Sequence, residues 1–233
     1  MIDIHAHILP FVDDGSDSLE KSLEMLRKEV ELGVTDVVCT PHFRAPYTKT
    51  PEELKTAFED FKKEVADAGI KINLHLGQEI CVSGLEEIDV KEKLKNGELL
   101  TVNDSKWVLI EFDFTRKCEI VEMVYELRNS GYIPIVAHLE RYFYADDDVA
   151  YEIKVEGGYI QVNAGSLVGK VNRKTKKFAK ELIKQGFVDF VASDVHSGRS
   201  NYLKEAYEFI QAKFGIAAAE VTCKINPKKM IKG

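Results

Sequence analysis

The feature that most constrains the fold of this chain is the alternation of apolar runs of strand length with stretches of helical period. The apolar runs occupy residues 2–7, 34–40, 70–79, 107–112, 132–138, 159–163 and 188–194. Helices are expected at 16–33, 50–69, 85–94, 119–129, 146–156, 174–185 and 202–214, and the second of them opens with a capping box of Thr50 and Glu53. Strands separated by helices pair in parallel, because each helix carries the chain back across the sheet. The sequence therefore predicts seven parallel strands ringed by helices.

Nearly continuous apolar runs, such as residues 188–192, are typical of strands that are covered on both faces. A closed or nearly closed parallel barrel meets this requirement, and an open seven-stranded α/β sheet is the competing fold. A chain of 233 residues, 45% of them hydrophobic, is long enough to form such a barrel as one domain spanning residues 1–233.

Charge and composition narrow the range of partners. The 39 acidic and 32 basic residues give a net charge of −7 without a dense basic block, so a nucleic-acid backbone is not an expected partner. No apolar run approaches the roughly 18 residues of a membrane span, and the start of the chain lacks the pattern of a signal peptide. We therefore expect a cytoplasmic protein without membrane insertion. The four cysteines are widely spaced, which suits reduced thiols.

Ligand-type side chains gather at the ends of the expected strands. His5 and His7 in the first strand project to one face, roughly 7 Å apart, and Ile2, Ile4 and Ala6 are expected on the other face. Alone, the two imidazoles could equally be hydrogen-bonded core histidines. Further ligand-type residues, however, lie at or near the ends of later strands: His42, Glu79, Glu111, His138, Asp194 and His196. The C-terminal ends of parallel strands meet at one edge, which is where such folds assemble their sites.

His75 is the exception among the six histidines. It lies four residues before Glu79, about 13 Å further down the same strand, so we expect it in the core or at the opposite end of the sheet.

The mixture of imidazoles and carboxylates without a thiolate selects Mn, Fe or Zn. Asp14, in the loop after the first strand, brings the set to nine residues, which exceeds what one ion binds, and Asp13 is its alternative. Three divalent ions against four carboxylates would leave a local charge of about +2, which attracts a phosphate group.

Eight motifs occur in the order HxH, DDG, TPH, GQEI, LIEF, AHLER, QVNAGSL and ASDVH. Together they resemble the PHP (polymerase and histidinol phosphatase) superfamily. The chain is most similar to the manganese-dependent protein-tyrosine phosphatases encoded with bacterial capsule and exopolysaccharide genes. The similarity runs from Met1 to about Ile231 and includes the terminal NPKKMI.

The resemblance implies a distorted seven-stranded (β/α)7 TIM-like barrel of the PHP type with three divalent metal ions. Manganese is the expected metal, with iron or zinc as alternatives. The first ion would be held by His5, His7, Glu79 and Asp194, and Glu79 would bridge to a second ion held also by Glu111 and His138. The third would be held by Asp14, His42 and His196. Arg141 would match a phosphate-binding arginine, and Arg199 would be a second one.

The implied function is hydrolysis of phosphotyrosine in a protein by a metal-bridged hydroxide. The expected partner is the tyrosine-phosphorylated tail of a bacterial tyrosine kinase that regulates capsule or exopolysaccharide synthesis. The alternatives are a small-molecule phosphoesterase such as a histidinol phosphatase, and a non-catalytic metal-binding PHP module.

A cysteine-dependent phosphatase is disfavoured by spacing. It would need an arginine six positions after its cysteine, but the residue six positions after Cys39 is Ala45. Arg44 and Tyr47, in the loop after His42, could contact the substrate or simply lie in a solvated loop.

Overall fold

The computed structural model describes residues 1–82 and 89–232. The strands are β1 Ile2–Ala6, β2 Asp36–Cys39, β3 His42–Phe43, β4 Asn73–Leu76, β5 Glu79–Val82, β6 Trp107–Phe112, β7 Ile133–Val136, β8 Tyr159–Asn163 and β9 Phe190–Ala192. The α-helices are α1 Leu19–Glu31, α2 Pro51–Asp67, α3 Val90–Lys95, α4 Ile120–Asn129, α5 Asp147–Val155, α6 Ala164–Val168, α7 Arg173–Lys184, α8 Leu203–Phe214, α9 Ile216–Glu220 and α10 Asn226–Lys232. Short 3₁₀ turns η1 (Val102–Asp104) and η2 (Leu139–Arg141) and a π-helical turn η3 (Val221–Ile225) complete the list. Part of the helix expected at 85–94 falls outside the described residues.

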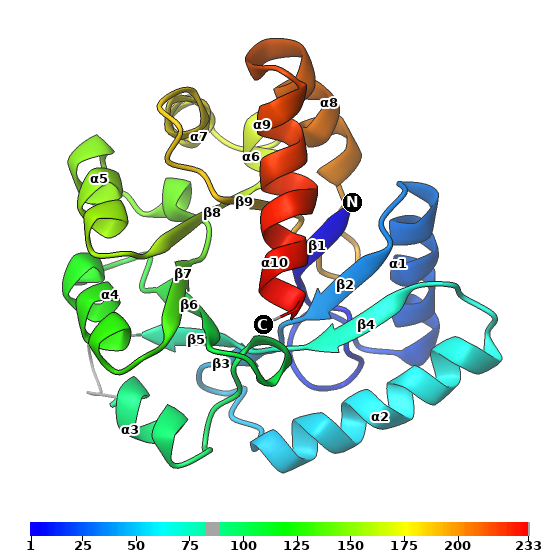
Figure 1. Ribbon diagram of the computed structural model, residues 1–233. Helices are drawn as coiled ribbons and strands as arrows, with labels where there is room; N and C mark the ends of the chain where they lie inside the picture. Colours follow the sequence, from blue (N-terminus) through cyan, green and yellow to red (C-terminus); the bar gives the residue numbers. More distant parts are fainter. Residues whose placement is uncertain (83–88, 233) are drawn as a thin grey trace.

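All the paired strands run parallel. β1, β2 and β4 form one ladder, and β3, β5, β6, β7, β8 and β9 form a second. A backbone hydrogen bond from Asp194 N to His5 O at 2.9 Å links the end of β9 in the second ladder to β1 in the first. The result is a curled parallel sheet with helices around its outside (Figure 1).

Two of the expected strands are interrupted. Segment 34–40 forms β2, and His42, expected just past that strand, begins the separate strand β3. Segment 70–79 forms β4 and the start of β5, so Glu79 begins a strand rather than ending one. Pro41 lies in the first gap and has no N–H group to donate to a ladder. Gly77 lies in the second gap, where a Cβ atom would come within 3.3 Å of the Val38 and Val102 side chains.

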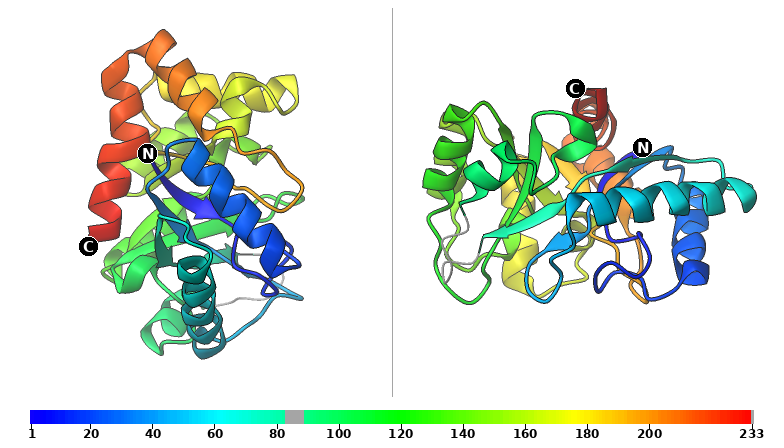
Figure 2. Two further views of the ribbon diagram at one scale, coloured as in Figure 1. Left: turned by 90° about the vertical axis from the view of Figure 1, so that its right-hand side faces the viewer. Right: turned by 90° about the horizontal axis from the view of Figure 1, so that it is seen from below.

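The curl of the sheet separates two apolar cores. The outer core fills the space between the sheet and its helices. The inner core takes alternate residues of the strands and is closed by Met230 of α10; its members include Ile2, Ile4, Val38, Trp107, Leu109, Ile135, Phe190 and Ala192. Figure 1 shows the C-terminal helical segment lying across the strands, and Figure 2 shows β1 running away from it. α9 to α10 had no counterpart in the expected elements.

The inner side of the first strand differs from expectation. Ile2 and Ile4 pack in the inner core, whereas Ala6 belongs to the outer core. The pairing of β1 with β2 shifts register between Asp3 and Ala6, and this irregularity changes the parity of the strand. The prediction that Ile2 and Ile4 face away from the histidines was therefore wrong, while Ala6 does face away.

Candidate metal centre

The nine side chains predicted as ligands lie close together at one end of the sheet, although His42 and Glu79 begin β3 and β5. Eight are buried, and Asp14 is partly exposed at 38% of its side chain. The strands themselves explain this, because the inner row of β6 reads Trp107, Leu109 and Glu111, apolar at the start of the strand and acidic at its end. His138 and Asp194 follow β7 and β9 with φ angles of +33° and +51°, a left-handed backbone that is costly for non-glycine residues.

Glu79 is the hub of the cluster. Its Oε1 lies 3.3 Å from His5 Nε2 and 2.9 Å from His138 Nε2. Its Oε2 lies 3.3 Å from His7 Nε2 and 2.8 Å from His42 Nδ1. One fully buried carboxylate is thus shared by four imidazoles from three different parts of the sheet.

The other two buried carboxylates lie at the edges of this hub. Asp194 Oδ1 is 3.7 Å from His5 Nε2 and 3.6 Å from His7 Nε2. Glu111 Oε1 is 3.6 Å from His138 Nε2. The carboxylates therefore alternate with the imidazoles around one small volume, as metal ligands do.

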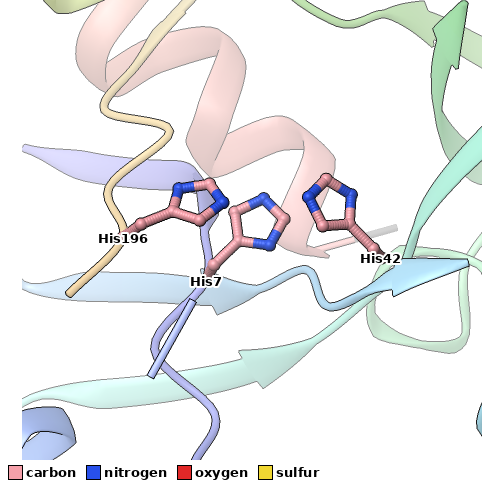
Figure 3. Close-up of side chains that lie close together, drawn as sticks. All are labelled: His7, His42 and His196. Atoms are coloured by element: carbon pink, nitrogen blue, oxygen red, sulfur yellow. The ribbon is translucent and has the colours of Figure 1, made fainter. Parts of the chain in front are cut away.

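A second group lies on the side of the loop after β1. His7 lies between His196 and His42, with ring centroids 4.1 Å and 4.2 Å away, respectively (Figure 3). Asp14 Oδ1 is 3.4 Å from His42 Nε2 and 3.7 Å from His196 Nε2. Gly15 permits the close approach of this loop, since a Cβ atom there would lie 2.2 Å from the carbonyl oxygen of His7.

The outer nitrogens of four histidines are already engaged. His5 Nδ1 lies 3.2 Å from Gln161 Oε1, and His7 Nδ1 lies 2.7 Å from Asp13 Oδ2. His138 Nδ1 lies 3.3 Å from Tyr142 Oη, and His196 Nδ1 lies 3.1 Å from the carbonyl oxygen of Asp194. Metal-bound imidazoles typically have their second nitrogen engaged in this way. In His5, His7 and His138, the Nε2 atom then faces the carboxylates.

The donor set also fits divalent ions by its unsatisfied atoms. His42 Nδ1, Glu79 Oε2 and Glu111 Oε2 are buried and make no hydrogen bond within the described residues; the 2.8 Å contact between the first two lacks the geometry of a hydrogen bond. Buried polar atoms without partners are rare in proteins, and an ion that they face would satisfy them. Four three-residue groups can each bring one ligand atom within 4.8 Å of the others: His7, His42 and His196; His5, His7 and Glu79; Asp13, Asp14 and His42; and His42, Glu79 and Glu111.

The close packing of charges perturbs the pKa values. Burial and the neighbouring Glu79 charge raise the pKa of Glu111 to about 8. Burial disfavours the charged form of His5, but Glu79 and Asp194 outweigh it and raise its pKa to about 9. Burial lowers the pKa of His138 to about 4. Strongly opposed shifts within one cluster are typical of a functional site.

Three arginines surround the cluster. Arg141 Nη1 donates to Asp194 Oδ2 at 3.2 Å, and its guanidinium carbon lies 4.4 Å from the centroid of the Phe114 ring. Arg199 Nη1 lies 3.4 Å from His196 Nδ1. Arg44 reaches Asp14 Oδ2 at 3.2 Å and Glu111 Oε2 at 3.7 Å, so it lies at the site rather than in a purely solvated loop. Cavities of about 560 Å³ and 540 Å³ adjoin Arg141 and Arg199, respectively.

Polar residues outside the nine make contacts of their own. Asp3 accepts the backbone N–H groups of His5 and Ser193 through its Oδ1 atom. His75 lies away from the cluster, with Nε2 3.2 Å from Asp36 Oδ1, as predicted. Sequence reasoning missed Gln161 and Asn163, although the motif QVNAGSL contains them, because amides are poor metal ligands and draw little attention.

Comparison with known proteins adds the family. A family model described as capsular polysaccharide synthesis, CpsB/CapC, matches residues 1–232. The tyrosine-protein phosphatase YwqE of Bacillus subtilis is 34% identical over 221 residues, covering 92% of this chain and 85% of the relative. The tyrosine-protein phosphatase CpsB of Streptococcus pneumoniae is 34% identical over 246 residues, covering 99% and 98%.

One solved structure from these relatives matches the whole chain, and a more distant one shares its fold. Crystal structures of YwqE and CpsB, described as unique metal-dependent tyrosine phosphatases, include a chain that matches with a TM-score of 0.91 and 31% identity, covering 100% of this chain and 94% of that one. A histidinol phosphate phosphatase of Lactococcus lactis matches with a TM-score of 0.58 and 13% identity over 95% of this chain and 94% of that one, and so shares the fold. On the family model and the relatives together, the chain belongs to the CpsB/CapC family of capsular polysaccharide synthesis.

Proposed function

We propose that this protein hydrolyses phosphotyrosine in proteins at a centre of three divalent metal ions. The observation that carries the proposal is the convergence of nine imidazole and carboxylate side chains, several with Nε2 facing inward, beside Arg141. The relatives that are 34% identical and named tyrosine-protein phosphatases support the same activity.

The ligand assignment follows the family pattern. His5, His7, Glu79 and Asp194 would hold the first ion; Glu79, Glu111 and His138 the second; and Asp14, His42 and His196 the third. Asp14 is preferred over Asp13, because the Asp13 carboxylate is occupied by His7 Nδ1 and by the N–H groups of Gly15 and His42. Manganese is the proposed metal, and β2 with β3 and β4 with β5 would count as two strands of a seven-stranded barrel.

The chain's own groups would bind and orient the phosphate. Bound divalent ions would supply Lewis acidity, lowering the pKa of water and neutralising the phosphoryl oxygens. Arg141 and Arg199 approach the cluster from two sides, and a guanidinium group suits bidentate contact with phosphate. Burial raises the pKa of Cys39 to about 12, and burial together with the Glu111 charge raises the pKa of Cys81 to about 12. Such high pKa values argue against a thiolate nucleophile.

Two alternative functions are a histidinol phosphatase and a non-catalytic metal-binding module. A histidinol phosphatase would use the same metals, but the relative with that activity shares only 13% identity. A non-catalytic module would be expected to have lost ligands, and all nine are present. The kinase partner and the cytoplasmic location remain predictions. None of the described helices has the length and apolar character needed to cross a membrane.

The test compares two substrates on metal-loaded protein. Protein loaded with manganese should hydrolyse a phosphotyrosine peptide with a higher kcat/KM than histidinol phosphate, and His138→Ala should abolish turnover. Elemental analysis of protein purified without chelator should give about three metal equivalents per chain. Failure on every phosphotyrosine peptide tried, with the metals bound, would refute the substrate assignment.

A further inference from the structure

We propose that Gln161 and Asn163 of β8 form an amide relay that fixes the orientation of three proposed ligands, His5, His138 and Asp194, and thereby sets the metal affinity. This inference rests on the metal centre of the proposed function. It makes the two amides positioning residues, because neither one is proposed to touch a metal ion or substrate.

β8 stands out among the strands. β1, β6 and the segments that follow β7 and β9 supply imidazoles or carboxylates to the cluster. The inner row of β8 instead reads Tyr159, Gln161 and Asn163. Gln161 is completely buried. A buried amide is destabilising unless its oxygen and its NH₂ group both have hydrogen-bond partners.

Gln161 contacts two of the ligands with one atom. Its Oε1 accepts the backbone N–H of His138 at 2.9 Å and lies 3.2 Å from His5 Nδ1. Its Nε2 donates to Asn163 Oδ1 at 2.8 Å. Asn163 Nδ2 in turn donates to Asp194 Oδ2 at 2.7 Å. One chain of hydrogen bonds therefore joins ligands from β1, the end of β7 and the end of β9.

The donor-to-acceptor direction of this series of hydrogen bonds is fixed at the His138 end. The backbone N–H of His138 can only donate, so the Gln161 atom facing it must be the carbonyl oxygen. The amide NH₂ of Gln161 then faces Asn163, whose oxygen must accept, and whose own NH₂ must therefore face Asp194. No other orientation of the two amides satisfies every contact.

This direction has consequences for the ligands. Because Gln161 Oε1 can only accept, the proton of neutral His5 lies on Nδ1, which leaves the Nε2 lone pair facing Glu79 and His7. Asp194 Oδ2 is taken by Asn163 and Arg141, which leaves Oδ1 as the oxygen nearest to His5 and His7. The relay thus selects which atom of each side chain is presented.

The simpler alternative is that the two amides only satisfy each other inside the protein. In that case their removal would lower stability without a specific effect on metal binding. Partners that orient metal ligands instead typically contribute a factor of 10 to 100 in metal affinity. Metal affinity measured alongside the stability of the metal-free protein separates the two.

The variants are Gln161→Met and Asn163→Leu, which keep the volume and remove the hydrogen bonds, and Gln161→Glu, which keeps the acceptor that faces His5 and His138. Asn226→Leu is the matched control, because Asn226 Nδ2 donates to the Asp189 carbonyl oxygen at 3.1 Å without touching a proposed ligand. Mn²⁺ affinity is measured by calorimetry, ligand geometry by the visible spectrum of the Co²⁺-loaded protein, and stability by thermal melts without metal.

We expect Gln161→Met and Asn163→Leu to lose about 10-fold to 100-fold in Mn²⁺ affinity and to change the Co²⁺ spectrum. Gln161→Glu should recover much of the affinity lost in Gln161→Met, and Asn226→Leu should keep wild-type affinity and spectrum. Should Gln161→Met not fold, Gln161→Glu and Asn163→Leu still report on each half of the relay.

Wild-type affinity and spectrum in Asn163→Leu or in a folded Gln161→Met would overturn the inference, and so would an equal loss of affinity in the Asn226→Leu control. A wild-type protein that binds no divalent metal would overturn the inference together with the metal centre. If the wild type binds metal but fails on phosphotyrosine, while the relay variants lose affinity, the relay is supported and the proposed substrate is refuted.

Discussion

Replacement of Glu111 by glutamine should reduce the stabilisation that metal provides without destabilising the metal-free protein. Glu111 is buried, and burial together with the Glu79 charge raises its pKa to about 8. At pH 7 the metal-free protein therefore carries this side chain mainly in its neutral form, which glutamine copies in shape and charge. We expect metal-free Glu111→Gln to melt near the wild type at about pH 4.5 and at a higher temperature than the wild type at pH 7, where folding of the wild type requires this carboxyl group to take up a proton.

The response to metal should differ sharply. At a metal concentration 100-fold above Kd, binding stabilises the wild type by about 2.7 kcal/mol. For a chain of this size that corresponds to a rise in Tm of roughly 5–11 °C. If loss of the carboxylate weakens binding about 100-fold, the same metal concentration stabilises the variant by only about 0.4 kcal/mol, or roughly 1–2 °C.

The pH dependence gives a second, independent signature. Glu111 has a raised pKa in the folded state, so the folded protein holds a proton that the unfolded chain has lost between about pH 4.5 and 8. The metal-free wild type should therefore lose stability relative to Glu111→Gln as the pH rises through this window.

The assay is thermal melting with and without MnCl₂ at several pH values. Glu29→Gln serves as the control, because Glu29 is equally buried and hydrogen-bonds to Asn201, away from the proposed ligands. A Tm rise with manganese that is the same in Glu111→Gln and the wild type would refute the assignment of Glu111 as a ligand. Equal loss of the manganese response in Glu29→Gln would show that the effect is not specific.

Four further predictions test other parts of the molecule. Because the pKa of His5 is raised to about 9 and that of Glu111 to about 8, manganese binding at pH 7 should release protons, measurable by calorimetry in buffers of different ionisation enthalpy. Arg141→Met should lower kcat on phosphotyrosine peptide by about 10²-fold or more, with Arg141→Lys less affected. Cys81→Ser should retain wild-type kcat/KM, and a total loss of turnover would reopen cysteine chemistry. Met230→Ala should lower the free energy of unfolding by about 2–5 kcal/mol in denaturant titrations, with manganese affinity unchanged.

The sequence predicted which side chains lie close together better than it predicted the strands that carry them. Ligand-type residues such as Glu111 could be found because side-chain alternation in a strand is rigid: two residues beyond Leu109, the next inner position must face the same volume. Family resemblance then ordered the set. The interruptions at Pro41 and Gly77 were less visible, because a kinked strand keeps the same apolar composition as a straight one.

Other features depend on tertiary contacts that no local pattern encodes. The register shift in β1 reverses the side of Ile4 relative to Ala6, and parity counted along the sequence cannot anticipate it. The left-handed conformations of His138 and Asp194 turn these side chains at the strand ends, at a local cost that the surrounding hydrogen bonds must offset. Gln161 of β8 contacts His5 of β1 and the backbone of His138 after β7, so its role arises only when these three segments have come together.

The inner side of the sheet divides into two parts with different sources of stability. Nearest α10, its rows are apolar and closed by Met230, so hydrophobic burial alone stabilises them. At the opposite end, the same rows change to Glu79, Glu111 and the histidines, where buried charges destabilise one another unless cations are bound. Hydrophobic packing can therefore form the barrel-like scaffold before metal arrives, and the ligand end is then held in shape by the hydrogen bonds of β8, Asp13 and Tyr142. In such a centre the apolar scaffold positions the side chains, and bound cations would offset the repulsion between the buried carboxylates.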